Sequence, residues 1–458
     1  MTAAQDAPWT LTATDLADHL ARGALRATDV LESCLMRIAA TNPRLGAVIH
    51  LDEAGARAAA AAADTRHAAG ESRGPLDGVP LLVKDNIFVR GLPCHWGSAA
   101  LSGFVPDEDE TAVARLRAAG MVILGKTNTP EFAAEGHTIS ARYGTTRNPW
   151  DPRLTPGGSS GGSVAAVAAG MAPVALGTDD GGSIRRPAAH TGLVGLKPSL
   201  GLLRREPGFP PVNFDFEVIG PIARCVADVA LLHRTMAGGA PRPPPARLRI
   251  RYVRRFEASP VDSEVLAATD RAAENLAAMG HAVEEGEAPI GPDEMHRILA
   301  VFVNTGIASV LDGLPEGAAA HVGASATQRA VAGRSLSAPD YFRNILAVRA
   351  FRARMRALFR EVDVIMTPAA AAQPWPADAP YPAIIEGRAA APRDHAVYTG
   401  FVNAAGLPGL ALPCGLDAAG LPVGFQIVAA ECEDELLLAL GASFEAAHPF
   451  AHRTPLPR

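Results

Sequence analysis

Cysteine and long apolar runs are both scarce in this chain of 458 residues. An odd number of scattered cysteines, with no Cys-x-x-Cys pair, predicts neither a disulfide framework nor a cysteine-based zinc site. The longest stretch of small apolar residues, 164–177, is broken by Gly170 and Pro173 and is shorter than the ~20 residues that cross a bilayer. The N-terminal residues lack the basic flank and apolar core of a secretory signal. We therefore expect a soluble, cytoplasmic protein that does not bind a membrane. The five cysteines are Cys34, Cys94, Cys225, Cys414 and Cys432.

Lysine is rarer still relative to the other charged residues. Of 42 basic residues only Lys84, Lys126 and Lys197 are lysines, and against 48 acidic residues the net charge is −6. No basic block stands out, so nothing indicates a nucleic-acid partner. Arginine cannot lose its proton in a protein, whereas a desolvated lysine can, so each lysine is a candidate for chemistry that arginine could not perform. The alternative is a coding bias that left three lysines over.

Hydrophobic residues make up 48% of the chain and charged residues 20%, which is typical of a globular protein. The N-terminal third combines helical patterns with short buried strands, and this alternation favours an α/β layer fold. The region 205–350 is mostly helical in texture, and the last glycine-rich strands are expected to complete the same sheet. The predicted helices include one that begins at Thr14 and Asp15, and 28–38, 53–69 and 110–119. The predicted strands include a short one that ends near Lys84, and 122–125, 173–179, 363–368, 410–413 and 424–429.

Two glycine-serine segments carry the sharpest signal. Pro156-Gly-Gly-Ser-Ser-Gly-Gly-Ser runs into a helix of small residues, and Thr178-Asp-Asp-Gly-Gly-Ser-Ile-Arg-Arg-Pro follows a predicted strand. Exposed N–H groups of such a turn can point at a developing oxyanion, and a serine there can act as a nucleophile if a base removes its proton. A phosphate-binding loop is disfavoured because the Gly-Lys-Ser/Thr ending is missing. An α/β-hydrolase elbow is disfavoured because no strand precedes Gly157-Gly-Ser-Ser-Gly. A pair of serines activated by a neutral lysine remains.

Lys84 in Val-Lys-Asp-Asn, together with both serine segments, resembles the amidase signature family of serine amidohydrolases. The similarity is strong over about residues 74–205 and weaker over 363–368 and 406–428. The resemblance implies a twisted mixed sheet of about eleven strands between helical layers. It also implies that Ser183 is the acylated nucleophile and that Ser159, 24 residues earlier, bridges it to the general base Lys84. The Gly158–Ser159 peptide bond is cis in the family.

The resemblance also assigns the oxyanion hole to the backbone N–H groups of Asp180, Gly181, Gly182 and Ser183. Asp180 departs from the family, many members of which carry an uncharged residue there, and a carboxylate at this place calls for a partner such as Arg185 or Arg186. Both arginines are expected to brace the loop. Candidate substrate-binding residues are Gly158, Arg186, Trp96 and Phe132, although Trp96 and Phe132 could equally pack in the core.

Other residues of the signature region are expected to be structural. Lys126 and Lys197 have no assigned catalytic part in the family. His95 and His137 are lone histidines near the site in sequence, and Cys94 would be a nucleophile only if the serine interpretation failed. The loop 367–394, with Trp375 and Tyr381, is rich in proline and alanine and is a candidate lid at an apolar entrance.

The sequence therefore predicts a serine hydrolase that cleaves C–N bonds of small-molecule amides, anilides or carbamates (urethanes), with esterase side activity. We expect no cofactor and no metal. We expect the protein to be a monomer or a homodimer. The alternative is the glutaminase subunit of a tRNA-dependent amidotransferase complex, which would associate with a second subunit. We expect one domain over 1–458, with a signature core at about 74–205, a substrate-shaping region at about 205–394 and a C-terminal part at about 395–458.

Overall fold

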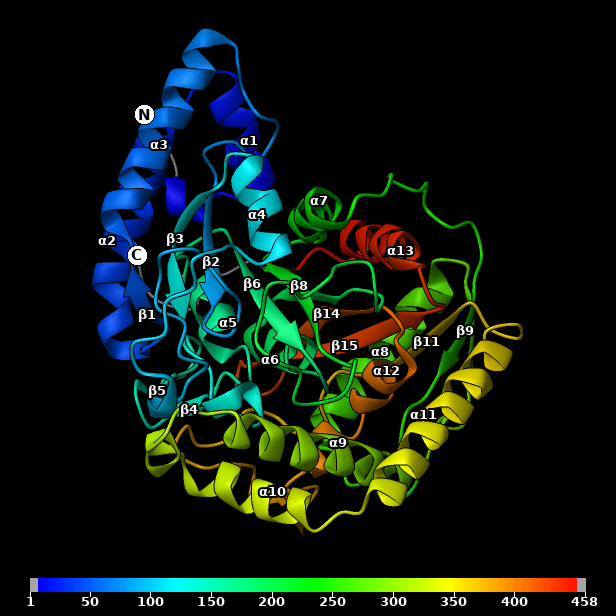
Figure 1. Cartoon of the computed structure of the whole chain (residues 1–458). Helices are drawn as coiled ribbons and strands as arrows, with labels where there is room; N and C mark the ends of the chain where they lie inside the picture. Colours follow the sequence, from blue (N-terminus) through cyan, green and yellow to red (C-terminus); the bar gives the residue numbers. More distant parts are fainter. Residues whose placement is uncertain (1–6, 451–458) are drawn as a thin grey trace.

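A computed structural model describes residues 7–450, so both ends of the predicted 1–458 domain lie outside the described residues. Its centre is a mixed sheet of eleven strands, as the resemblance implied (Figure 1). Parallel pairs join β3 to β2, β2 to β6, β11 to β9 and β9 to β10, and the other neighbours are antiparallel. In spatial order the strands are β1 (Val48–Leu51), β3 (Val122–Thr127), β2 (Pro80–Lys84), β6 (Val174–Asp179), β8 (Val218–Ala223), β7 (Val194–Lys197), β14 (Gly409–Leu416), β15 (Pro422–Ala429), β11 (Val364–Pro368), β9 (Arg249–Tyr252) and β10 (Ala282–Glu285).

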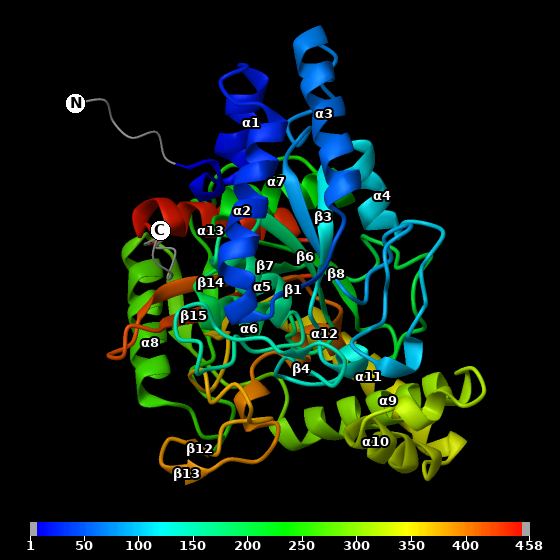
Figure 2. The ribbon, with the colours of Figure 1, turned by 90° about the vertical axis from the view of Figure 1, so that its left-hand side faces the viewer.

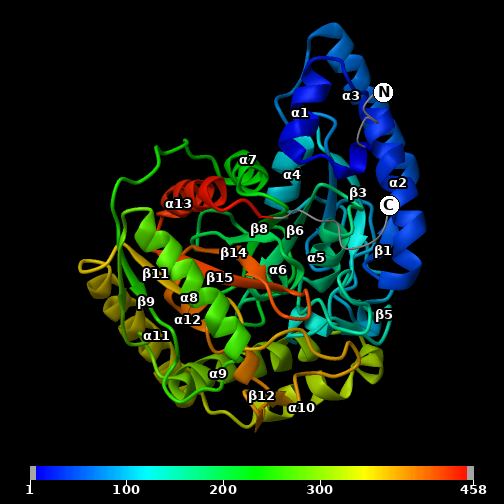
Figure 3. The same cartoon turned by 180° about the vertical axis from the view of Figure 1, so that it is seen from behind.

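Helices cover both faces of this sheet because its strands are apolar on both sides. In β11, Val364 and Met366 belong to one hydrophobic cluster and Ile365 to another. Side chains alternate between the faces of a strand, so each face needs its own helical layer. Seen from behind, α8 crosses β14 and β15 (Figure 3). The helices are α1 (Ala13–Ala21), α2 (Ala27–Leu45), α3 (Glu53–Ala69), α4 (Thr111–Ala118), α5 (Gly161–Ala168), α6 (Arg185–Thr191), α7 (Val226–Ala237), α8 (Ser263–Ala278), α9 (Pro292–Asp312), α10 (Ala324–Arg334), α11 (Ala338–Leu358), α12 (Gly400–Ala405) and α13 (Asp434–Ala447).

The two ends of the molecule are built from different parts of the chain. Helices α1 and α3 lie at one end, and the paired helices α9 and α10 lie at the other (Figures 1 and 2). No helix among residues 7–450 is long and apolar enough to cross a membrane.

The local predictions are mostly confirmed. Helix α3 covers 53–69 and strand β2 ends at Lys84, both as predicted. The description of 205–350 as mostly helical is incomplete, because it also contributes β8, β9 and β10 to the sheet. Gly220 and Pro221 interrupt the apolar pattern expected of a buried strand in β8. In β9, arginines at alternate positions weaken the same pattern. Strands from all three predicted regions join one sheet. The candidate lid contains only a short hairpin, β12 (Ile384–Ile385) and β13 (Arg388–Ala389).

Candidate active site

Lys84 is the last residue of β2, and its side chain is completely buried. Its Nζ donates to Ser159 Oγ at 2.7 Å and to Thr178 Oγ1 at 2.9 Å on the adjacent parallel strand β6. Within residues 7–450 no carboxylate forms an ion pair with this ammonium, not even that of the neighbouring Asp85. Burial lowers the pKa of Lys84 to about 8, because desolvation penalises the charged form. A neutral lysine is therefore accessible at ordinary pH.

Ser159 lies just before α5, after a Gly158–Ser159 peptide bond that is cis, as the resemblance implied. The helix N-cap position belongs to Ser160, so Ser159 is not a capping residue. Ser160 Oγ donates to the Thr178 carbonyl at 3.1 Å, and its N–H donates to the Ser183 carbonyl at 3.1 Å. These two bonds place the Ser159 loop against the end of β6.

Ser183 lies in the turn between β6 and α6, at the wall of a cavity of about 670 Å³. Its hydroxyl donates to Asp180 Oδ1 at 3.3 Å. In the described part of the chain, the Lys84–Ser159 contact is formed, whereas Ser183 makes no hydrogen bond to Ser159. The structure thus brings lysine and bridging serine together and turns the third hydroxyl toward Asp180.

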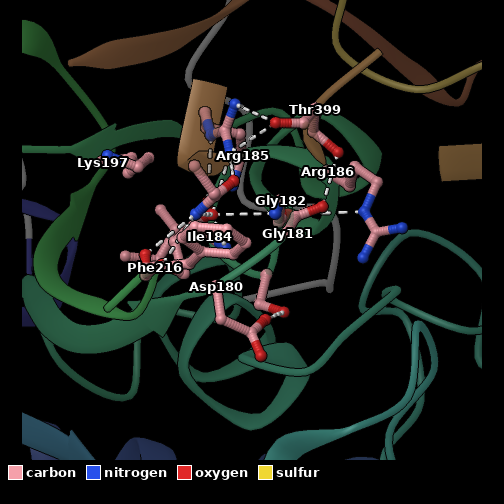
Figure 4. Close-up of polar contacts among 12 residues, drawn as sticks. Asp180, Gly181, Gly182, Ile184, Arg185, Arg186, Lys197, Phe216 and Thr399 are labelled. Carbon is pink, nitrogen blue, oxygen red and sulfur yellow. Dashed lines mark hydrogen bonds and ion pairs between the residues drawn. The ribbon is translucent and has the colours of Figure 1, made fainter. Parts of the chain in front are cut away.

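The turn is held by Asp179 and Arg185, whose side chains are both buried. Arg185 forms an ion pair with Asp179 at 2.8 Å and also donates to Gln426 and to Asn403. It donates to the Thr399 carbonyl as well (Figure 4). Charge-assisted hydrogen bonds of this kind fix a loop firmly, as predicted for Arg185. This pairing lowers the pKa of Asp179, with Asn403 contributing a further hydrogen bond.

The backbone N–H groups of this turn are not equivalent. Gly182 N–H donates to Asp179 Oδ1 at 2.8 Å. This N–H group of the predicted oxyanion hole therefore already has an acceptor within the protein. Among residues 7–450, the N–H groups of Asp180, Gly181 and Ser183 donate to no protein acceptor. Gly182 has φ +113°, and a Cβ there would lie 2.1 Å from Thr399 Oγ1, so no other residue fits.

The cavity is lined differently from the prediction. Arg186 lines it, donating to the Gly182 and Gly158 carbonyls at 3.4 Å each. Trp96 and Phe132 do not, because they pack edge to face, with ring centroids 5.5 Å apart, in a separate hydrophobic cluster. Sequence reasoning missed Arg393 and Asn213, which contribute to the lining from loops without a motif. Burial and the nearby Arg393 lower the pKa of Arg186 to about 9.

The aromatic residues of the candidate lid are not at an entrance. Trp375 is 3% exposed, its ring contacts His190 and His395, and its Nε1 donates to the Ala379 carbonyl at 2.9 Å. The candidate lid reaches the cavity instead at its C-terminal end, through residues 391–394.

The remaining candidates have internal partners. Lys197 Nζ donates to the Pro198 and Leu407 carbonyls, and Lys126 Nζ donates to the Ile87 carbonyl and to Cys94 Sγ. These contacts agree with the structural roles expected of both lysines. His95 contacts Tyr143, and His137 Nδ1 lies 3.0 Å from the Pro380 carbonyl. Burial raises the pKa of the Cys94 thiol to about 12, which disfavours a nucleophilic thiolate.

A family model described as Amidase matches residues 29–438. The chain belongs to the amidase signature family. It is 37% identical to a glutamyl-tRNA(Gln) amidotransferase subunit of Roseiflexus sp. (strain RS-1), over 97% of this chain and 98% of that one. Among solved structures, a bacterial aryl acylamidase of the amidase signature family matches with a TM-score of 0.90 and 27% identity, over 98% of this chain and 99% of that one. A 6-aminohexanoate cyclic dimer hydrolase matches with a TM-score of 0.86 and 29% identity, over the same shares of the two chains. This amidase signature protein is therefore an amide-cleaving enzyme.

Proposed function

We propose that the enzyme hydrolyses amide bonds through an acyl-enzyme on Ser183, with Ser159 and Lys84 as its proton relay. The observation that carries the proposal is the buried 2.7 Å hydrogen bond between Lys84 Nζ and Ser159 Oγ. Ser183 itself lines the cavity. Neutral Lys84 accepts the Ser159 proton while Ser159 accepts that of Ser183, whose Oγ attacks the carbonyl carbon. The relay then needs Ser183 to turn from Asp180 toward Ser159, and catalytic hydrogen bonds often form only with substrate bound.

The oxyanion of the tetrahedral intermediate is stabilised by the N–H groups of Asp180, Gly181 and Ser183. The relay returns its proton to the leaving nitrogen, the C–N bond breaks, and water releases the acyl group by the same route. Protonation of nitrogen through a serine suits amides and anilides, extends to carbamates (urethanes), and permits easier ester hydrolysis. The scheme uses no metal or cofactor.

Two substrate assignments follow from the relatives. Small-molecule amides are supported by the likeness to the aryl acylamidase and the cyclic dimer hydrolase. The glutaminase subunit of a tRNA-dependent amidotransferase is supported by 37% identity over nearly the full length of both chains. The higher sequence identity favours this second assignment, which requires a partner subunit, whereas the first is compatible with a monomer or homodimer.

Covalent labelling tests the shared chemistry. The protein is treated with phenylmethylsulfonyl fluoride and its intact mass is measured, in parallel with Ser183→Ala and Ser160→Ala. One adduct on the wild type and on Ser160→Ala, and none on Ser183→Ala, is expected. An adduct that persists on Ser183→Ala contradicts the assignment of the nucleophile.

Substrate panels then separate the two assignments. Ammonia release from glutamine, without release of 4-nitroaniline from 4-nitroanilides, supports the amidotransferase subunit. Release of 4-nitroaniline or of an amine from an aryl carbamate by the isolated chain, without glutaminase activity, supports the small-molecule hydrolase.

A further inference from the structure

Asp180 places a carboxylate directly beside the nucleophile. Its side chain lines the cavity, and Oδ1 lies 3.3 Å from Ser183 Oγ (Figure 4 shows Asp180 apart from the Arg185 network). Asn213 also contacts this residue, but its Nδ2 donates to the backbone carbonyl of Asp180 and not to the carboxylate. Asp180 as a whole is 9% exposed.

This carboxylate forms no ion pair with a cation among residues 7–450. Arg185 forms its ion pair with Asp179, and Arg186 donates to backbone carbonyls. A buried carboxylate without a partner is costly, and the cost falls when a cation arrives. Burial, reinforced by the negative charge of Glu217, raises the pKa of Asp180 to about 6. At neutral pH the group is therefore mostly an anion in front of Ser183 that no cation among residues 7–450 contacts, while the charges of Lys84 and Arg393 act on it from a greater distance.

A fixed negative charge at this place works against the developing oxyanion unless the substrate supplies a positive one. Because Oδ1 lies within 3.3 Å of the attacking oxygen, the group that it can contact is attached close to the scissile carbonyl carbon. A protonated amine on the α carbon meets this condition, and it would replace the Ser183 hydroxyl as the partner of Asp180. Ser183 would thereby be released toward Ser159.

We propose that Asp180 determines specificity by binding a protonated amine α to the scissile carbonyl. The preferred substrates are then α-amino acid amides and arylamides with a free amino group. The inference rests on the proposed hydrolysis through Ser183 and on the small-molecule assignment, because the amine of glutamine is not α to its scissile carbonyl. It adds the class of acyl group.

The rest of the cavity agrees with a cationic occupant. Five carboxylates line it, those of Asp180, Glu135, Glu257, Asp293 and Asp394, against the guanidinium groups of Arg186, Arg329 and Arg393 and one histidine, His296. Arg329 is neutralised by Glu135 at 3.1 Å. Arg186 and Arg393 would instead suit a substrate carboxylate, so an anionic acyl group is the competing outcome of the test.

The test uses three arylamides with the same leaving group. Alanine 4-nitroanilide and propanoyl 4-nitroanilide differ only in the α-ammonium, and succinic mono-4-nitroanilide carries a carboxylate. We measure kcat/KM at about pH 7 for the wild type, for Asp180→Asn and for Asp107→Asn, a control at an exposed carboxylate that does not line the cavity. Asparagine keeps a hydrogen-bond acceptor for Ser183 while removing the charge. Because an α-ammonium activates any amide intrinsically, the informative quantity is the change in the alanine-to-propanoyl ratio between variants.

Asp180→Asn is expected to lower this ratio by roughly tenfold or more, the usual effect of a lost charge-assisted hydrogen bond. The propanoyl substrate should be hydrolysed faster by this variant, since the charge opposing the oxyanion is gone. Asp107→Asn should leave the ratio unchanged. An unchanged ratio in Asp180→Asn, an equal fall in Asp107→Asn, or a wild-type preference for the succinyl substrate overturns the inference alone, provided that Ser183-dependent hydrolysis is seen. If none of the three arylamides is hydrolysed and Ser183 is not labelled, the proposed function itself fails.

Discussion

The Asp179 carboxylate and the Arg185 guanidinium form an ion pair at 2.8 Å, with both side chains fully buried at the base of the turn that carries Ser183. Asp179 also accepts hydrogen bonds from the N–H groups of Gly182 and Ile184, which flank Ser183. One carboxylate thus fixes both the backbone on either side of Ser183 and the arginine that connects this turn to Thr399, Asn403 and Gln426.

Asp179→Asn should therefore destabilise the protein and inactivate it together. Removing one partner of a buried ion pair leaves the other charge uncompensated, which costs ~3–5 kcal/mol in the free energy of unfolding. Urea denaturation measures this loss. Glu32→Gln, which breaks an ion pair whose two side chains are about half exposed, is the matched control and should change little. Equal effects of the two substitutions would contradict the structural role given to Asp179.

The pH dependence of kcat/KM should follow Lys84. Its pKa is lowered to about 8 by burial, and the base is the neutral form, so activity toward a neutral amide rises as pH increases through about 8. The profile is measured between about pH 6 and 10 with propanoyl 4-nitroanilide, whose charge does not change. A rate that is already constant below about pH 7 would exclude Lys84 as the base.

Thr178→Val should shift this profile. The Thr178 hydroxyl accepts a hydrogen bond from Lys84 Nζ at 2.9 Å, and such an acceptor favours the charged ammonium. Its removal lowers the pKa of Lys84 further. The acidic limb of the kcat/KM profile therefore shifts to lower pH by ~1 unit. Thr191→Val is the control, because that buried hydroxyl donates to the Pro187 carbonyl and is remote from Lys84 in the hydrogen-bond network. A limb that moves to higher pH would contradict the arrangement.

Ser159→Ala and Ser160→Ala should differ sharply although the two serines are neighbours. Ser159 Oγ bonds Lys84, and loss of a proton relay typically reduces the rate ~10²–10⁴-fold. Among the residues that the structure describes, Ser160 Oγ bonds only the Thr178 carbonyl, so its loss costs ~1 kcal/mol of stability and a smaller share of activity. Single-turnover rates and thermal unfolding separate these effects. Similar rate losses in both variants would contradict the assignment of Ser159 as the proton relay.

Trp96→Ala should affect stability and not substrate binding. Trp96 is 1% exposed and stacks on Phe209 with ring centroids 4.5 Å apart, away from the cavity lining. Truncation of a buried tryptophan costs ~3–5 kcal/mol. Denaturation monitors this loss, and KM for the arylamides should stay near its original value at a temperature where the variant is folded. Arg393→Gln, at the cavity wall, is the comparison that should change KM.

Helix α3 and the turn that carries Ser183 were predictable, because the residues that specify each of them are close together in the sequence. Helix α3 is an alanine-rich helix between Asp52 and Gly70, and the Ser183 turn needs glycine at 182 for a steric reason that acts within a few ångströms. The motif therefore indicated Lys84, Ser159 and Ser183 before any geometry was known. Strand β8 could not be predicted in the same way, since Gly220 and Pro221 weaken a strand pattern that only pairing with β6 and β7 overrides.

The sequence by itself determined the family, the central strands of the motif region and the chemical groups available, because these depend on short patterns and on residue types. Only the tertiary structure decided which groups meet. It held Arg185 on its near neighbour Asp179 through Thr399, Asn403 and Gln426, which are far away in the sequence, and it left Asp180 without an ion pair among residues 7–450. It also excluded Trp96 from the cavity and placed Arg393 there. Burial, which no local pattern specifies, set the pKa values of Lys84 and Asp180 on which the proposed chemistry depends.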